Sequence, residues 1–164
     1  MRHRIRAFLA CCAVAPLGTL AADPGHVEVG REIGAVLAWR LGPEIVEEKC
    51  READPAGIEA RGRALQSWQS KNAALIRTVD ERVAEVALLA YPSPDPAKTV
   101  AAVRAKVRQL MLETISAQGD TAKLAASCKH DADPASARWS SNGVSQVHNS
   151  LAALYDWKTQ IEKK

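Results

Sequence analysis

Apolar residues recur at intervals of three and four positions along most of this 164-residue sequence. This spacing gathers them on one side of an α-helix, because a helix turns by about 100° per residue. No comparable stretch alternates apolar and polar residues, which is the pattern of a strand with one buried face. The sequence therefore predicts an all-α fold, an irregular bundle of four main helices plus one or two short ones.

The first half of the chain predicts two main helices. The first begins near Val29 and is expected to break at Gly42-Pro43, since proline lacks an amide donor and crowds the preceding turn. A short helix is expected to continue from there to about Cys50. Asp54-Pro55 is typical of a helix start, an N-cap followed by proline. The apolar face that follows stays in phase to about Ala90, which predicts one long helix.

The second half predicts two further main helices and a short one. A proline-rich turn over residues 91–96 ends the long helix. Asp95-Pro96 repeats the start pattern, and the next helix is expected to end near Gly119. A short helix that includes Cys128 follows. The last helix is expected over about residues 144–161.

The first 22 residues are predicted to be a secretory signal peptide, followed by a single α-helical domain over residues 23–164. A basic start, a short apolar run and small residues before a cleavage after Ala21 or Ala22 form the three regions of such a signal. The apolar run is much shorter than the roughly 20 residues that span a bilayer. The alternatives are an ordinary amphipathic helix and a lipoprotein signal at Leu9-Ala10-Cys11.

The predicted signal peptide carries the excess positive charge of the chain. The whole sequence has 22 Lys and Arg against 19 Asp and Glu. Arg2, Arg4 and Arg6 lie in the leader, which contains no acid, so its removal leaves 19 residues of each sign. A neutral domain has no net field to attract nucleic acid or anionic lipid. We therefore expect a periplasmic or secreted protein whose partner is another protein, with no nucleic acid bound and no stable membrane insertion.

One predicted helix, over about residues 96–118, is nevertheless basic. Its four basic residues are Lys98, Arg104, Lys106 and Arg108. On a helical wheel they fall on both sides of the apolar stripe, where long side chains keep their charge in water while their stems cover the core. We therefore interpret them as a solvated face and not as a nucleic-acid or lipid surface.

Two cysteines remain once the leader is removed, because Cys11 and Cys12 lie within it. An even pair in an exported chain predicts one disulfide, between Cys50 and Cys128, formed in an oxidising compartment. This bond completes the predicted fold class. The alternative is a pair of free or redox-active thiols, but the sequence has no C-x-x-C spacing and no activating neighbourhood to favour it.

Three polar residues fall on predicted inward faces: Arg40, Arg61 and Asn72. A buried amide or guanidinium needs hydrogen-bond partners, since leaving one unpaired costs about 1–3 kcal/mol or more. These residues predict either an internal hydrogen-bond network that fixes the helix register or the polar floor of a pocket between helices. They are the candidate ligand-binding residues of the sequence.

The sequence contains no catalytic motif that we can recognise: no G-x-S-x-G, P-loop, H-E-x-x-H, C-x-x-C-H or G-x-G-x-x-G. His130, Asp131 and Asp133 lie close together, but their spacing matches no zinc or calcium pattern. We therefore predict no catalytic residue, no metal and no cofactor.

Three functions remain open from the sequence. The first is a protein-interaction module, such as an inhibitor, an immunity-like factor or an adaptor, with Trp39 and Trp157 as candidate interface residues because tryptophan is a favoured interface anchor. Partial burial against neighbouring helices is the alternative role for both tryptophans. The second function is a small-ligand-binding bundle with a polar pocket near Arg61 and Asn72. The third is an enzyme of unrecognised type.

Overall fold

The computed structural model of the chain describes residues 24–117, 119–131 and 144–163, and all regular elements within them are helical. The predicted signal peptide therefore lies outside the described residues, as does Asp133. The elements in chain order are α1 (Pro24–Ala53), the 3-10 turn η2 (Pro55–Gly57), α2 (Ile58–Lys71), α3 (Ala73–Ala90), α4 (Pro96–Ala117), α5 (Thr121–Asp131) and α6 (Val144–Glu162). The predicted all-α bundle with a disulfide is confirmed.

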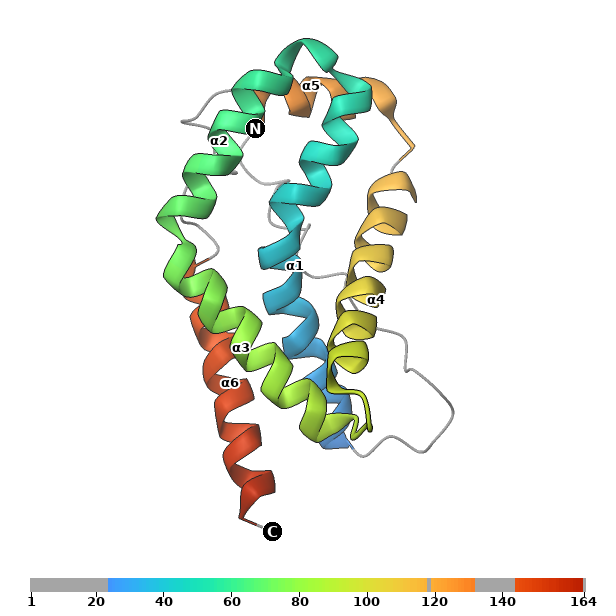
Figure 1. Cartoon of the computed structure of the whole chain (residues 1–164). Coiled ribbons are helices and arrows are strands. Elements are labelled where there is room, and N and C mark those ends of the chain that lie inside the picture. Colours follow the sequence, from blue (N-terminus) through green and yellow to red (C-terminus); the bar gives the residue numbers. More distant parts are fainter. Residues whose placement is uncertain (1–23, 118, 132–143, 164) are drawn as a thin grey trace.

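Helix α1 is the central element of the bundle. It contacts α2, α3, α4, α5 and α6 (Figure 1). Helices α2 and α3 run back alongside it, α4 lies along another side, and α5 crosses the end where α1 turns into α2. The core is a single cluster of mainly aliphatic side chains from α1, α3, α4 and α6. Its buried members are Val29, Ile33, Val36, Leu37, Val79, Val83, Val86, Ala90, Val107, Val147, Leu151 and Leu154.

The predicted break at Gly42-Pro43 is wrong, because α1 continues through Pro43 to Ala53. Proline removes one intrahelical hydrogen bond, but packing on both sides of it holds the helix together. Leu37 and Ile45, on either side of the proline, are fully buried. An added Cβ at Gly42 would lie 3.4 Å from Met111 Cε of α4, an ordinary van der Waals distance, so α4 packs directly against α1 beside the proline.

The single long helix predicted up to Ala90 is also wrong in one respect. It is divided at Asn72 into α2 and α3. The Asn72 side chain donates from Nδ2 to the Trp68 carbonyl oxygen at 2.8 Å, and the backbone N–H of Asn72 donates to the same oxygen. Asparagine side chains commonly compete with backbone N–H groups for such hydrogen bonds, which gives asparagine a low propensity for the interior of a helix. The apolar stripe nevertheless continues across the division, as predicted, from Trp68 to Val79.

The two Asp-Pro sequences have different roles. Asp95 is an N-cap as predicted, since its Oδ1 accepts a hydrogen bond from the backbone N–H of Lys98 at 3.0 Å. Asp54 makes no such cap, and Pro55 opens the 3-10 turn before α2 begins. The carboxylate of Asp54 instead binds Arg61. The same local sequence therefore gives a helix cap in one place and a tertiary contact in the other.

Candidate functional site

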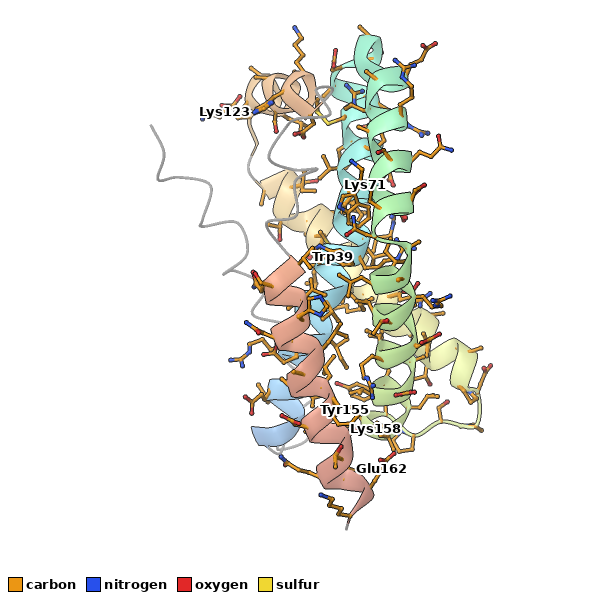
Figure 2. The ribbon with its side chains drawn as sticks, turned by 90° about the vertical axis from the view of Figure 1, so that its left-hand side faces the viewer. Trp39, Lys71, Lys123, Tyr155, Lys158 and Glu162 are labelled. Carbon is orange, nitrogen blue, oxygen red and sulfur yellow. A yellow bond between two sulfur atoms is a disulfide. The ribbon has the colours of Figure 1, made fainter. Side chains whose placement is uncertain are left out.

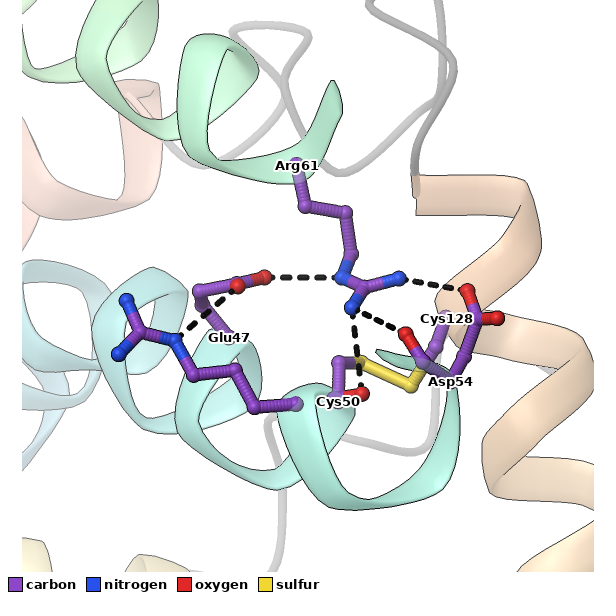
Figure 3. Close-up of a disulfide and its surroundings, with 6 residues drawn as sticks. Glu47, Cys50, Asp54, Arg61 and Cys128 are labelled. Carbon is purple, nitrogen blue, oxygen red and sulfur yellow. Dashed lines mark hydrogen bonds and ion pairs between the residues drawn. A yellow bond between two sulfur atoms is a disulfide. The ribbon is translucent and has the colours of Figure 1, made fainter. Parts of the chain in front are cut away.

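The most enclosed cation among the described residues is the guanidinium of Arg61, which is 1% exposed. Its Nε donates to Glu47 Oε2 at 2.9 Å and its Nη1 donates to Asp54 Oδ2 at 2.6 Å. Its Nη2 donates to the backbone carbonyl oxygens of Cys50 and Asp54, at 3.2 and 2.7 Å (Figure 3). The guanidinium is therefore bonded on every side by its own chain.

This cluster closes the C-terminal end of α1. The last carbonyl groups of a helix have no partner within it, and they carry partial negative charge. Arg61 reaches across from α2 to the carbonyl oxygen of Asp54, just beyond the helix, and to that of Cys50, which also accepts from the backbone N–H of Asp54. Glu47 is 4% exposed and also accepts a hydrogen bond from Arg51. The arrangement explains why an arginine occupies an inward position of α2: it joins the ends of two helices.

Gly57 makes room for the cluster. An added Cβ at this position would lie 2.2 Å from Arg61 Nη1 and 2.6 Å from Asp54 Oδ2. Both atoms are held by the ion pair between them, so neither can move without weakening it. Glycine is required here for the close approach of the side chains.

The predicted disulfide lies beside this cluster. Cys50 of α1 and Cys128 of α5 are bonded, with their Cα atoms 5.4 Å apart, and both residues are 0% exposed. Figure 3 shows the bond next to Asp54 and Arg61. The bond therefore ties α5 to the end of α1 that Arg61 secures from the other side.

Arg40 belongs to a second polar group, which joins four helices. Its Nη1 donates to Glu44 Oε1 at 2.7 Å within α1, and its Nε lies 3.6 Å from Asp80 Oδ2 of α3. Gln69 of α2 donates to the same Glu44 oxygen, and Arg104 of α4 donates to Asp80 Oδ1. Burial alone lowers the pKa of Arg40, but hydrogen bonds and charge from Glu44 and Asp80 outweigh it, so its pKa is raised above the ordinary value.

The three candidate residues do not form one site. Arg61 lies near the start of α2 and Asn72 at its end, eleven positions later, which is roughly 16 Å along a helix axis. The Asn72 amide bonds to the Trp68 carbonyl within its own helix segment, and Arg40 bonds within the four-helix group. The structure therefore gives each of the three its own partners on the protein.

The candidate interface tryptophans are both partly buried against the core. Trp39 packs on Trp68, with ring centroids 5.1 Å apart and planes tilted by 55°. Figure 2 shows Trp39 in the middle of the bundle, about halfway along its length. Tyr155 on α6 is more exposed, at 54%, and the Arg82 guanidinium carbon lies 5.0 Å from the centre of its ring.

A different surface, which was not predicted from the sequence, lies along α4. Of the 22 residues of α4, only Val107 is buried. Its outer flank, which we call the α4 flank, consists of Ala97, Ala101, Ala105 and Leu112. The alanines recur every four residues, so they lie in one row along the helix. This four-residue spacing is separate from the apolar stripe that faces the core. It is the feature of the sequence that points to this surface.

Two open hollows lie along the α4 flank. One is bounded by α4 alone, around Ala105, Arg108 and Leu112. The other lies between α3 and α4, with Leu88 on one side and residues such as Ala101 on the other. Neither hollow includes Arg61 or Asn72. Part of the apolar surface of the described residues therefore lies on the outside of α4, in hollows that are separate from the Arg61 cluster.

The described part of the chain contains no group of three or more His, Cys, Asp or Glu side chains placed to hold a metal ion. None of its helices combines the length and the hydropathy needed to cross a membrane. The chain matches no known protein family, no curated protein and no solved structure.

Proposed function

We propose that this chain is an exported protein-interaction module of the periplasm or the extracellular space, and that its partner docks an α-helix on the α4 flank. The observation that carries the proposal is the single buried residue among the 22 of α4. A helix covered on one side only leaves apolar surface in water, and surface of this kind commonly marks a protein–protein contact.

The residues along α4 suit a docked helix. Val100, Leu112 and Ile115 are all partly exposed, and none of them is among the side chains packed on the core cluster. The row of alanines lets a second helix backbone approach closely, and Leu112 supplies a larger apolar contact beyond the row. A helix lying along α4 could extend over roughly 33 Å, the length of 22 residues.

The charge of α4 favours an acidic partner. The helix carries four basic residues and one acidic residue, Glu113. Arg104 pairs with Asp80, and Arg108 pairs with Glu48. No ion pair of the described residues involves the other two basic side chains, Lys98 and Lys106. A partner helix with acidic residues along its edges would pair with these lysines.

A second copy of this chain is a less suitable occupant. Two α4 helices packed antiparallel about a two-fold axis at Ala105 would place Arg104 of one copy beside Arg104 of the other, and Lys106 beside Lys106. Like charges at the centre of an interface oppose association. The proposal is therefore for a different protein.

The compartment is proposed on two grounds. Residues 1–22 have the three regions of a secretory signal. A disulfide such as that between Cys50 and Cys128 is typical of proteins from oxidising environments outside the cytoplasm, which supports the proposed compartment. The burial of Arg61 is consistent with a structural role for the candidate polar residues Arg40, Arg61 and Asn72. It therefore favours a surface over an internal pocket as the functional site.

Site-specific photo-crosslinking tests the proposal. A photoreactive p-benzoylphenylalanine replaces Ala105 in the full-length chain, produced in its own cells, and Ala153 on α6 serves as the control. Both alanines are exposed on helices. We expect a discrete crosslinked protein from position 105 that is absent from position 153. The double change Lys98→Glu and Lys106→Glu should reduce its yield. No adduct at position 105, or the same adduct at both positions, would contradict the proposal.

A further inference from the structure

Helix α5 is held to the bundle differently from the other helices. It is eleven residues long, and Leu124 is its only large aliphatic residue. Among its described side chains only Cys128 and Asp131 are buried. Its main contact is with α1, and it lies across the end of the bundle instead of along it (Figure 1). Lys123, near its start, is exposed and points away from the other helices (Figure 2). Apolar packing therefore contributes little to its position.

The two ends of the disulfide are supported unequally. On the α1 side, the Cys50 carbonyl accepts hydrogen bonds from Arg61 and from the backbone N–H of Asp54. Neither hydrogen bond involves a sulfur atom, so neither requires the disulfide. On the α5 side, the chain enters the helix from Gly119, whose φ of 62° turns it sharply after α4. Release of Cys128 would therefore remove the covalent link between α5 and α1 without breaking any hydrogen bond of the Arg61 cluster.

We propose that the Cys50–Cys128 bond is a redox-sensitive latch that holds α5 over the end of α1. A dithiol reductant opens it by thiol–disulfide exchange. One thiolate attacks a sulfur of the bond to give a mixed disulfide, and the second thiolate displaces the protein sulfur. The protein gains two electrons and two protons as two thiols, and the reductant becomes a cyclic disulfide. Helix α5 then leaves α1, and the rest of the bundle stays folded.

Burial of the sulfurs sets the rate of this reaction. Cys50 and Cys128 are both 0% exposed, so a reductant reaches them only when α5 moves away transiently. The latch therefore resists brief exposure to thiols and responds to sustained reduction. It is independent of the proposed partner surface, since α5 contributes no residue to the α4 flank.

Hydrogen exchange followed by mass spectrometry tests the latch on the full chain without its leader. The oxidised protein is compared with the same protein treated with dithiothreitol and with the double variant C50A/C128A. We expect amides of residues 121–131 to exchange faster by on the order of 100-fold in both cases. Peptides that contain Val36, Val83 and Leu154 should keep their protection.

Two results would overturn the latch. Unchanged exchange in α5 would show that packing holds it, and loss of protection throughout would show that the bond holds the whole bundle. Leu124→Ala in the oxidised protein is the matched control for packing. It should leave α5 exchange within about threefold of the wild type, because the bond still holds the helix. Release of α5 by this substitution alone would also count against the latch.

Discussion

Arg61 and Glu47 form an ion pair, 2.9 Å between Nε and Oε2, in which the side chains are only 1% and 4% exposed. The residues belong to different helices, α2 and α1, and both side chains are almost fully shielded from solvent. A buried pair of this kind contributes little compared with an apolar pair of the same shape, but breaking it leaves a buried charge without a partner. The pair therefore fixes how the two helices meet.

Replacing Arg61 should destabilise the protein strongly. Arg61→Met leaves Glu47 and Asp54 buried without their cation, and we expect a loss of about 3–5 kcal/mol in the free energy of unfolding. Arg61→Lys should also be destabilising, because one ammonium group cannot reproduce the four hydrogen bonds of the guanidinium. Urea unfolding monitored by circular dichroism measures the change. Arg63→Ala, on the exposed side of the same helix, should stay within about 0.5 kcal/mol of the wild type.

Two glycines near the start of α2 should respond in opposite directions to alanine. Gly57→Ala places a methyl group against Arg61 Nη1 and Asp54 Oδ2, and it should cost about 1–3 kcal/mol of unfolding free energy. Gly62→Ala meets nothing within 4 Å and lies within the helix, so it should stabilise by about 0.4–1 kcal/mol. The same unfolding measurement applies to both. Equal effects would show that the crowding at Gly57 is not important.

Asn72 should be dispensable for stability. Its side chain bonds to the Trp68 carbonyl in its own helix segment, and alanine favours a continuous helix. We expect Asn72→Ala to leave the unfolding free energy within about 1 kcal/mol of the wild type, or slightly above it. The melting temperature measures this change. A large loss would mean that Asn72 has a role in the core beyond this local bond.

Asp120 caps the start of α5 and gives that helix a pH dependence. Its side-chain hydrogen bond with Lys123, together with one from the Lys123 backbone N–H, lowers the pKa of Asp120 below its ordinary value. Because the pKa is lower in the folded state, ionised Asp120 contributes to the free energy of unfolding, and this contribution is fully present at pH values above the ordinary pKa of aspartate. The contribution is lost as the pH falls through the lower pKa of the folded state. Carboxyl NMR titration should find the lowered pKa, and Lys123→Ala should move it back toward the ordinary value. An unchanged pKa in that variant would exclude Lys123 as the cause.

If the chain is exported as proposed, the mature protein should contain two cysteines and no free thiol. If the leader is cleaved after Ala21 or Ala22, only Cys50 and Cys128 remain, and these are bonded. Iodoacetamide should add nothing to the native protein, and two groups after reduction in denaturant, as read by intact mass. Four added groups would mean that the leader is retained. Two groups added before reduction would mean that the bond does not form in the cell.

Much of the fold could be predicted because it depends on local patterns. The spacing of Val79, Val83 and Val86 identified a buried face, and Asp95 identified a helix start that the structure confirms. The break predicted at Pro43 was wrong because tertiary packing outweighs the missing hydrogen bond. The division at Asn72 depends on a hydrogen bond from one side chain to a backbone carbonyl, and the spacing of apolar residues carries no information about such a bond.

The candidate site was harder to predict, because its contacts join residues that are distant in the sequence. Arg61 could be recognised as a polar residue on an inward face. Its partners Glu47 and Asp54 lie 14 and 7 positions away and meet it only after the chain turns between α1 and α2. The exposure of the α4 flank could not be predicted from the sequence, because a row of alanines is equally compatible with a helix face buried against another helix and with a face open to solvent.

The disulfide spans 78 positions and so makes α2, α3 and α4 part of one covalent ring. The exposed turn between α3 and α4, residues 91–95, lies inside that ring. A protease that cuts this turn produces two fragments that remain joined through the sulfurs and cannot diffuse apart. Degradation of the oxidised protein therefore needs a second cut within the ring or a reductant, and a single nick leaves the helices able to reassemble.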